Sequence, residues 1–281
     1  MTVPAEVREH WREARASARN DGLVPALTLL SRALSPGAPP RGPRGHAVVP
    51  RELLEEYRDL AEPDTPDPLP GLAVLPPEPG PRPRPAPDPQ LWGTGLAWLR
   101  LGHSERLRAA CVAYLAARTV EGTSLLLQQM VKGALADALI EQLEIAGVLD
   151  ELAGPDRPDD PFLSCHPLDA RALTRLQAQI TEVDRALLRL LGAHGFTAEG
   201  PGRDAHASEL LADVHCGWPG AAEPCTPDGG GHVDGDRHHA LHGIEHGIEH
   251  RTGHATHQGA DHGSDRGPDH ATDRRATGID G

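Results

Sequence analysis

Large aromatic side chains are scarce in this chain. Aromatic residues make up only 3% of the 281 residues, whereas there are 31 glycines and 28 prolines. This composition is typical of folded islands separated by segments that cannot bury enough apolar surface to fold. The apolar residues are concentrated between Leu91 and Leu211, and they are numerous enough for one helical core.

The chain also lacks several features that define broad classes of protein. Its formal net charge is −14, so the basic surface that contacts nucleic-acid phosphates or anionic lipids is not expected. No apolar run approaches the roughly 18 to 20 residues of a membrane span. The first residues lack the basic-then-apolar pattern of a signal peptide, and we expect a cytoplasmic protein.

Cysteine usage gives no support for a metal ribbon or a disulfide framework. The four cysteines, Cys111, Cys165, Cys216 and Cys225, include no C-x-x-C pair. Neither their number nor their spacing is that of a small disulfide-rich domain.

Residues 1–62 are predicted to form a small helical segment. Apolar spacing indicates helices at Glu6–Arg19, Leu23–Leu34 and Arg51–Ala61. The segment is too small to have its own core, so we expect it to dock on the main bundle or on a partner. Residues 63–90 contain twelve prolines, which predicts an extended, semi-rigid linker. An SH3-type ligand in residues 81–85 is the alternative interpretation.

Residues 91–217 are predicted to be an all-α, up-and-down bundle of three long helices and a short one. The long helices are expected at about 91–118, 124–152 and 170–190, and the short one at about 205–214. The third has the clearest pattern, with Asp169 as its N-cap and Gly192 as its end. Its apolar residues are spaced alternately by three and four, at Leu173, Leu176, Ile180, Val183, Leu187 and Leu190.

Two segments about sixty residues apart carry a family resemblance. The first is Arg118-Thr-Val-Glu-Gly122, followed by Gln128-Gln129 and Leu135-Ala-Asp137. The second is Gly192-Ala-His-Gly-Phe196, followed by Pro201 and Val214-His-Cys-Gly217. Their order and spacing resemble the C-terminal helical domain of the acyl-CoA dehydrogenases, in which the patterns are R-x-x-F-G, L-A-D/E, G-G-x-G-Y and I-Y-E-G-T. The resemblance covers residues 91–217, and the β-domain of that family has no counterpart here.

The resemblance implies a set of contacts to flavin adenine dinucleotide (FAD). The arginine of the family motif contacts the cofactor pyrophosphate across a subunit interface, and guanidinium is suited to that contact. Glycines in the later turn let the backbone approach the dinucleotide. The candidate cofactor-binding residues are therefore Arg118, Gln128, Gln129, Arg189, Gly192 and Gly195.

The resemblance also identifies the position of the catalytic base. The family glutamate that removes the α-proton of the acyl thioester is replaced by Cys216. Some relatives carry their base on the first bundle helix instead, where this chain has Trp92. A thiol and an indole are poorly suited to this proton transfer. Glu209 and Asp213 are nearby acids, interpreted as solvated charges on the last helix.

Residues 218–281 are predicted to be a disordered tail, rich in Gly, Asp and His. Histidines recur at every fourth residue at His238, His242, His246, His250 and His254. On a helix this spacing would align imidazoles able to hold nickel or zinc. A low-complexity solubilising tail with incidental metal affinity is the other interpretation.

The sequence therefore leads to three functional hypotheses. In the first, the chain is a non-catalytic or heteromeric partner subunit, associated with a second copy or an acyl-CoA dehydrogenase-type chain. In the second, it is a residual flavin-dependent dehydrogenase acting on an acyl-CoA or carrier-bound acyl chain. In the third, it is a metal-binding protein that acts through its tail.

Overall fold

The computed structural model describes residues 3–57, 69–77, 87–153, 168–197 and 200–217. The chain divides into two compact units, Met1–Cys225 and Thr226–Gly281. The second unit, with the histidines at 238, 242, 246, 250 and 254, lies outside the described residues. The helices of the first unit are α1 (Ala5–Asn20), α2 (Leu23–Leu34), α3 (Pro89–Ala116), α4 (Gln129–Leu152), α5 (Ala170–Leu191) and α6 (Gly202–His215).

The prediction of a mainly helical chain is confirmed, with the addition of two short antiparallel hairpins that the sequence did not predict. The first hairpin pairs β1 (Ala47–Pro50) with β2 (Leu72–Leu75), and the second pairs β3 (Thr119–Val120) with β4 (Thr123–Ser124). Three 3₁₀ turns complete the described elements: η1 (Arg51–Leu53), η2 (Leu125–Leu127) and η3 (Gly192–Phe196). None of the helices in the described part of the chain is long and apolar enough to cross a membrane.

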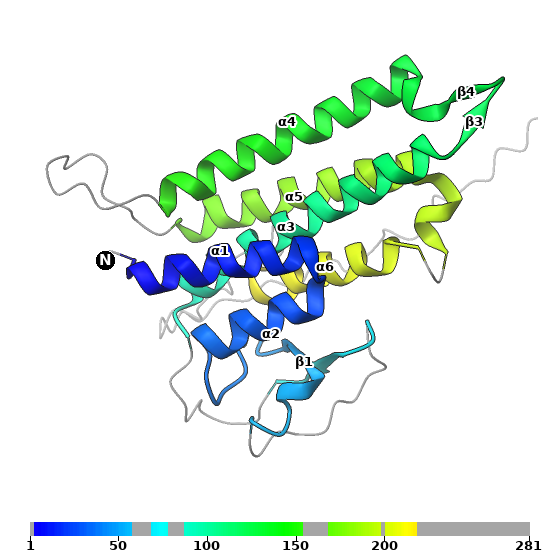
Figure 1. The fold of residues 1–281 in the computed structure, drawn as a ribbon. Coiled ribbons are helices and arrows are strands. Elements are labelled where there is room, and N and C mark those ends of the chain that lie inside the picture. Colours follow the sequence, from blue (N-terminus) through cyan, green and yellow to red (C-terminus); the bar gives the residue numbers. More distant parts are fainter. Residues whose placement is uncertain (1–2, 58–68, 78–86, 154–167, 198–199, 218–281) are drawn as a thin grey trace, which may run out of the picture. The chain divides into compact units, whose positions relative to one another are not determined.

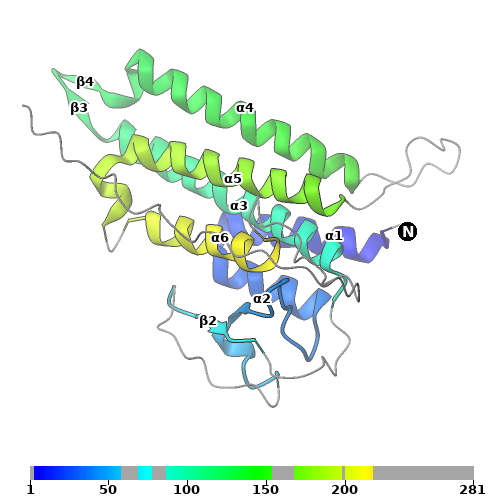
Figure 2. The ribbon, with the colours of Figure 1, turned by 180° about the vertical axis from the view of Figure 1, so that it is seen from behind.

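Helix α3 is the central element of the fold, with α1, α2, α4, α5 and α6 packed around it (Figures 1 and 2). Residues 92–104 of α3 are buried on every side. Glycines make this possible because they let neighbouring backbones approach closely. A Cβ atom on Gly102 would overlap the carbonyl group of Arg15 in α1. On another side of α3, a Cβ atom on Gly93 would overlap the side chain of Leu173 in α5.

Helix α5 forms as the sequence predicts. The Asp169 side chain accepts a hydrogen bond of 2.7 Å from the backbone N–H of Ala172 and so caps the helix. Gly192 ends it with a φ of 56°, in the left-handed region that favours glycine. The apolar residues between these ends are buried against α3 and α4, except for Leu190, which is half-buried.

The N-terminal segment packs on the bundle, one of its two expected placements. Trp11 and Leu27 belong to the same apolar core as α3 and α5. The helix expected at Arg51–Ala61 is wrong over its described part, where only the turn η1 forms. Tyr57 packs with the β1–β2 hairpin in a small second core instead. Strand β2 lies inside the predicted proline-rich linker, where β1 supplies the partner for its backbone groups.

The β3–β4 hairpin changes two predicted helix ends. Helix α3 ends at Ala116 rather than Arg118, and α4 begins at Gln129 rather than Ser124. The reason is a tight turn at Glu121 and Gly122, whose φ angles are 51° and 77°. Two successive positive φ values suit the sharp turn of a two-residue hairpin.

Candidate cofactor and ligand sites

The structure links Arg118 to the glycine turn η3 through the ring of Tyr114. The Arg118 guanidinium lies over the ring of Tyr114, with Cζ 4.5 Å from the ring centroid. The other neighbour of this ring is His194 of η3, stacked at 4.2 Å with an angle of 1° between the two planes. Arg118, Tyr114 and His194 therefore join the end of α3 to the turn after α5. Tyr114, which was not predicted from the sequence as a site residue, makes this connection.

The two predicted glycines of η3 have different structural roles, one at a turn and one in a tightly packed position. Gly192 ends α5 at a positive φ. Gly195 is buried, and a Cβ atom there would lie 3.2 Å from the carbonyl oxygen of Leu188. The carbonyl group of Gly195 in turn packs so closely on Gly202 that a Cβ atom on Gly202 would overlap it. The turn is thus fixed against the start of α6.

The other predicted cofactor contacts are not all gathered at this turn. Gln128 and Gln129 are exposed at the start of α4. Arg189 is on α5, with 69% of its side chain exposed and one nitrogen 3.9 Å from the Glu182 carboxylate. Within the described residues, Arg118 forms no ion pair with a carboxylate, so its positive charge is free for an anion. Among the predicted cofactor contacts, Arg118 is therefore the residue that best fits a pyrophosphate group.

The predicted base position lies at the other end of α3. Cys216 follows the last residue of α6, and its sulfur is 3.5 Å from where a Cβ atom on Gly93 would lie. Trp92 packs edge-on against His215, with 5.5 Å between the ring centroids. The two positions that the family resemblance assigns to the base are therefore side by side. From Trp92 to Ala116, the last residue of α3, the rise of the helix gives a separation of about 36 Å.

Burial makes this end of the bundle unsuitable for proton abstraction at neutral pH. Burial raises the pKa of the Cys216 thiol to about 11, although Arg100 and Gln177 oppose the shift. The neighbouring His215 is buried under β1, where its Nε2 atom is 3.4 Å from both the backbone nitrogen and the carbonyl oxygen of Val48. Burial lowers the pKa of His215 to about 4. At pH 7 both groups are therefore uncharged.

Of the two nearby acids, Asp213 is exposed, as the sequence suggested, whereas Glu209 is only partly exposed. Glu209 was interpreted as a solvated charge, but it accepts a hydrogen bond of 2.5 Å from Arg185 of α5. Asp213 is also on α6, and partial burial raises the pKa of its carboxyl group, an effect that Glu209 strengthens. Neither residue replaces the missing glutamate at the C-terminal end of α6.

A buried arginine connects three helices near the middle of the bundle. Arg100 of α3 donates to the Ser208 hydroxyl of α6 at 3.0 Å. It also donates to the side-chain oxygen of Gln177 at 2.6 Å and to the Thr181 hydroxyl at 2.8 Å, both on α5. A buried charge is tolerated when its donors are satisfied in this way. Its signal in the sequence was a single charge inside the apolar run Leu96–Leu101, and it was not predicted as a site residue.

Asp184 of α5 is the second buried charged residue that was not predicted from the sequence. Only 3% of the residue is exposed, and neither carboxylate oxygen has a hydrogen-bond partner within 3.5 Å. Burial raises its pKa to about 7, while Ser104 and Arg100 act in the opposite direction. Asp184 lies between Val183 and Leu187 of the predicted apolar seam. This position was the only indication in the sequence that Asp184 is buried.

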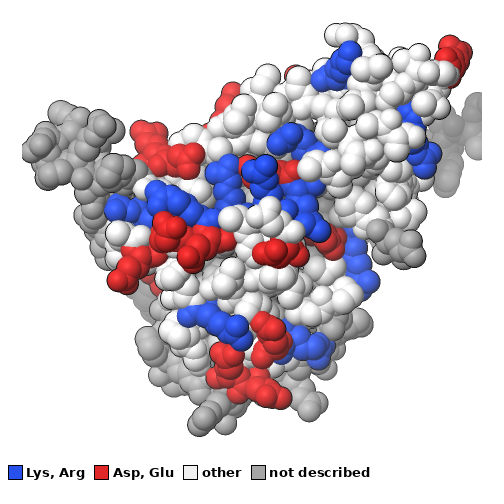
Figure 3. Space-filling view, viewed as in Figure 1, with Lys and Arg blue, Asp and Glu red and all other residues white. Residues whose placement is uncertain are grey.

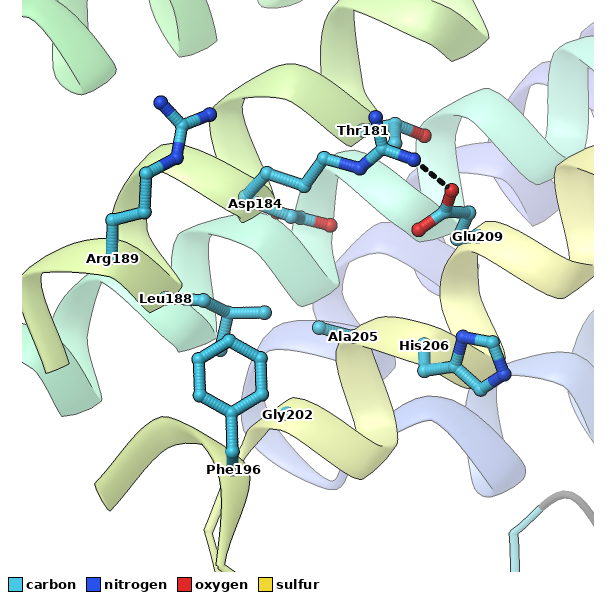
Figure 4. A pocket seen from close by; sticks show the side chains of 10 residues that line it. Thr181, Asp184, Leu188, Arg189, Phe196, Gly202, Ala205, His206 and Glu209 are labelled. Carbon is cyan, nitrogen blue, oxygen red and sulfur yellow. Dashed lines mark hydrogen bonds and ion pairs between the residues drawn. The ribbon is translucent and has the colours of Figure 1, made fainter. Parts of the chain in front are cut away.

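Asp184 lines a cavity of about 430 Å³ between α5 and α6 (Figure 4). Leu188, Ala205 and Phe196 form apolar parts of its wall, and Arg185 and Glu209 meet across it. In the described part of the chain no group of three or more His, Cys, Asp or Glu residues is arranged to hold a metal ion. The histidine ladder predicted to bind nickel or zinc lies outside the described residues.

The chain was compared with protein-family models and with curated proteins, and neither comparison found a match.

Proposed function

We propose that this protein is a non-catalytic or heteromeric partner subunit related to FAD-dependent acyl-thioester dehydrogenases, with a bundle like the C-terminal domain of the acyl-CoA dehydrogenases. One observation carries the proposal. Arg118 is linked through Tyr114 to the glycine turn η3 near one end of α3, while a partly buried thiol, Cys216, stands at the predicted base position near the other end. Arg118 thus supports recognition of an anion, whereas Cys216 does not support proton abstraction.

The cofactor end is suited to a dinucleotide phosphate. Arg118 has no carboxylate partner among the described residues, and its side chain is held in place by the Tyr114 ring. A pre-positioned guanidinium binds phosphate with less loss of side-chain entropy. The flavin, when bound, would supply hydride acceptance, and this chain would supply a phosphate contact and a rigid turn.

The base end lacks a group that can take a proton. A thiol with a pKa of about 11 is almost wholly protonated at neutral pH. Trp92 and His215 fill the space beside it. A partner chain with its own glutamate and β-domain would therefore have to complete any active site.

Helix α4 offers a surface for such a partner. Several of its apolar residues are largely exposed, including Met130 at 87%, Ile140 at 53% and Leu143 at 61%. Ile140 and Leu143 share a helix face with Gly133, Ala136 and Gly147, small residues that would allow close approach of another helix. The upper part of the molecule, where Figure 1 places α4, has few charged side chains in Figure 3. Exposed apolar faces of this kind mark interaction sites.

The first test is the visible absorbance of the untagged protein after incubation with excess FAD and removal of the free cofactor. Bound oxidised flavin gives peaks at about 370 and 450 nm. We expect flavin to be retained by the wild-type chain and lost on Arg118→Ala. Arg171→Ala, at an exposed arginine near the start of α5, is the matched control and should retain it. A colourless wild-type protein would contradict the cofactor half of the proposal.

The second test addresses catalysis and association. The flavin-loaded chain is mixed with acyl-CoA thioesters of several chain lengths, and absorbance at about 450 nm is followed. No bleaching is expected from the chain alone, and rapid bleaching would identify it as a dehydrogenase. Light scattering then compares the molar mass of the wild type with that of Leu143→Glu. A monomeric wild type that gains no mass with a candidate partner would refute the subunit role.

A further inference from the structure

Helix α4 carries a heptad pattern on its outer face. The helix lies at the outside of the bundle in both views (Figures 1 and 2), and its inner face packs on α3 and α5. On the side turned away from these helices, residues spaced alternately by three and four form a seam, which has the spacing of the a and d positions of a coiled coil. The seam consists of Gly133, Ala136, Ile140, Leu143 and Gly147, all of them exposed.

The seam has two large apolar side chains at its centre and small residues toward its ends. Ile140 is 53% exposed and Leu143 is 61% exposed. Among the described residues, nothing lies within 4 Å of where a Cβ atom on Gly133 or Gly147 would be. Glycine inside a helix is destabilising, but on this face it leaves room for a neighbouring helix. Large apolar side chains of such a helix would lie over the two glycines.

Acidic residues follow one side of this seam. Asp137, Glu144 and Glu151 are spaced by seven residues, and all three are exposed. They occupy the e positions of the same heptads. The other side of the seam, formed by the g positions, has a single charge, that of Lys132. Because charges at e and g decide which helices pair and in which orientation, three acidic e positions favour basic residues on the facing helix.

A second copy of the chain fits this charge pattern poorly. In an antiparallel pair the e positions face each other, which places Asp137 near Glu144 of the partner subunit, and like charges repel. In a parallel pair e faces g, and only Lys132 would supply a cation. The net charge of −14 on each chain adds to the repulsion. A helix with a basic flank, in contrast, complements all three acids.

We propose that this face of α4 binds a cationic amphipathic helix of a different protein. The apolar residues of that helix would pack on Ile140 and Leu143, and its lysines or arginines would face Asp137, Glu144 and Glu151. The inference rests on the proposed function, because it names the chemistry of the partner that a non-catalytic subunit requires.

The test uses the full-length protein and two labelled synthetic peptides of about three heptads. Both have leucine at the a and d positions and alanine elsewhere, except that one has lysine and its matched control has glutamate at every e and g position. Fluorescence anisotropy measures binding. Ion pairs in place of repulsions predict at least about tenfold tighter binding of the lysine peptide, with a smaller difference at high salt. Equal affinities, or no binding of the lysine peptide, would overturn the proposal.

Two double variants with the same change of net charge locate the contact. Asp137→Lys combined with Glu144→Lys reverses the acidic row, so the glutamate peptide should then bind more tightly than the lysine peptide. Glu9→Lys combined with Glu13→Lys makes the same change at exposed residues of α1 and should preserve the preference for lysine. Equal effects of the two double variants would show attraction by net charge alone and would refute the site.

Light scattering and flavin absorbance separate this inference from its rivals. A wild-type dimer that Leu143→Glu converts to a monomer would assign the face to a second copy and overturn the proposal. Flavin retention without binding of the lysine peptide would contradict the inference about the partner alone. Peptide binding at α4 by a chain that retains no flavin would support this face while contradicting the cofactor half of the proposed function.

Discussion

Asp184 should make the stability of this protein fall as the pH rises through the neutral range. Burial raises its pKa from 3.8 to about 7. Between these two values the folded protein keeps the proton while the unfolded chain has released it. The unfolded state then binds fewer protons, so the free energy of unfolding decreases with rising pH in this window. Below pH 3.8 and above pH 7 this group adds no further slope.

The magnitude depends on the size of the shift. Each pKa unit is worth about 1.36 kcal/mol, so the full shift of about three units corresponds to about 4 kcal/mol. From pH 5 to pH 8 only the part up to pH 7 counts, which is about 3 kcal/mol. Asp184→Asn cannot ionise and is free of this loss. The free energy of unfolding of the variant should therefore gain about 3 kcal/mol relative to the wild type between pH 5 and pH 8.

Urea denaturation of both proteins at pH 5, 6, 7 and 8 measures this difference. Comparison of the two proteins removes the contributions of all other titrating groups that they share. The coulombic interaction of Asp184 with Arg100 is lost in the variant. This loss changes the difference in the free energy of unfolding between the two proteins at high pH, but it does not change the direction in which that difference varies with pH. Parallel curves for wild type and Asp184→Asn over this range would show that Asp184 keeps no proton through the neutral range.

Two further predictions concern the packing of α3. Gly102→Ala should lower the free energy of unfolding by about 1–3 kcal/mol because its Cβ atom would overlap the backbone of Arg15. Gly147→Ala is a helical control that faces open space and should raise the free energy of unfolding by about 0.5–1 kcal/mol. Chemical denaturation measures both variants, and equal effects would contradict the close packing at Gly102. His103 is buried with neither ring nitrogen partnered, and burial lowers its pKa to about 4, so the folded protein binds fewer protons than the unfolded chain between pH 6.5 and 4. The wild type should lose about 3 kcal/mol from this residue over that range, a loss that His103→Leu avoids; if acid unfolding curves of the two proteins coincide, His103 is not held neutral by burial.

The predicted cofactor residues show how far a linear pattern could be followed. The sequence spacing assigned Arg118 and Gly192 to the same family motifs. In the fold, Arg118 contacts Tyr114, and Tyr114 contacts the turn that begins at Gly192. The contact that joins them depends on Tyr114 stacking on His194, and a single sequence does not specify which aromatic ring meets which turn. The hairpin at Glu121 and Gly122 was missed because Glu is an unusual residue at a positive φ.

Asp184 and Arg100 show where prediction from the sequence failed. Arg100 stands in an apolar run, whereas Asp184 lies among polar residues beside the apolar seam of α5. Each was passed over in favour of its apolar neighbours. Whether a charged residue at such a position snorkels to solvent or stays buried depends on the helices packed against it. Here α6 and α5 enclose Arg100 and provide its acceptors, while Asp184 is enclosed beside Ser104 and Arg100.

Two helices in particular could be predicted from the amino-acid order alone. Helix α2 was predicted with its observed ends, and α5 was predicted from its apolar spacing, its Asp169 cap and its Gly192 end, because these depend on interactions within a few residues. Three features required the packed chain: α1 and α2 join the core around α3, β1 covers His215, and Asp184 is buried. They arise from contacts between segments far apart in the chain, whose free energies depend on shape and burial that local sequence does not encode.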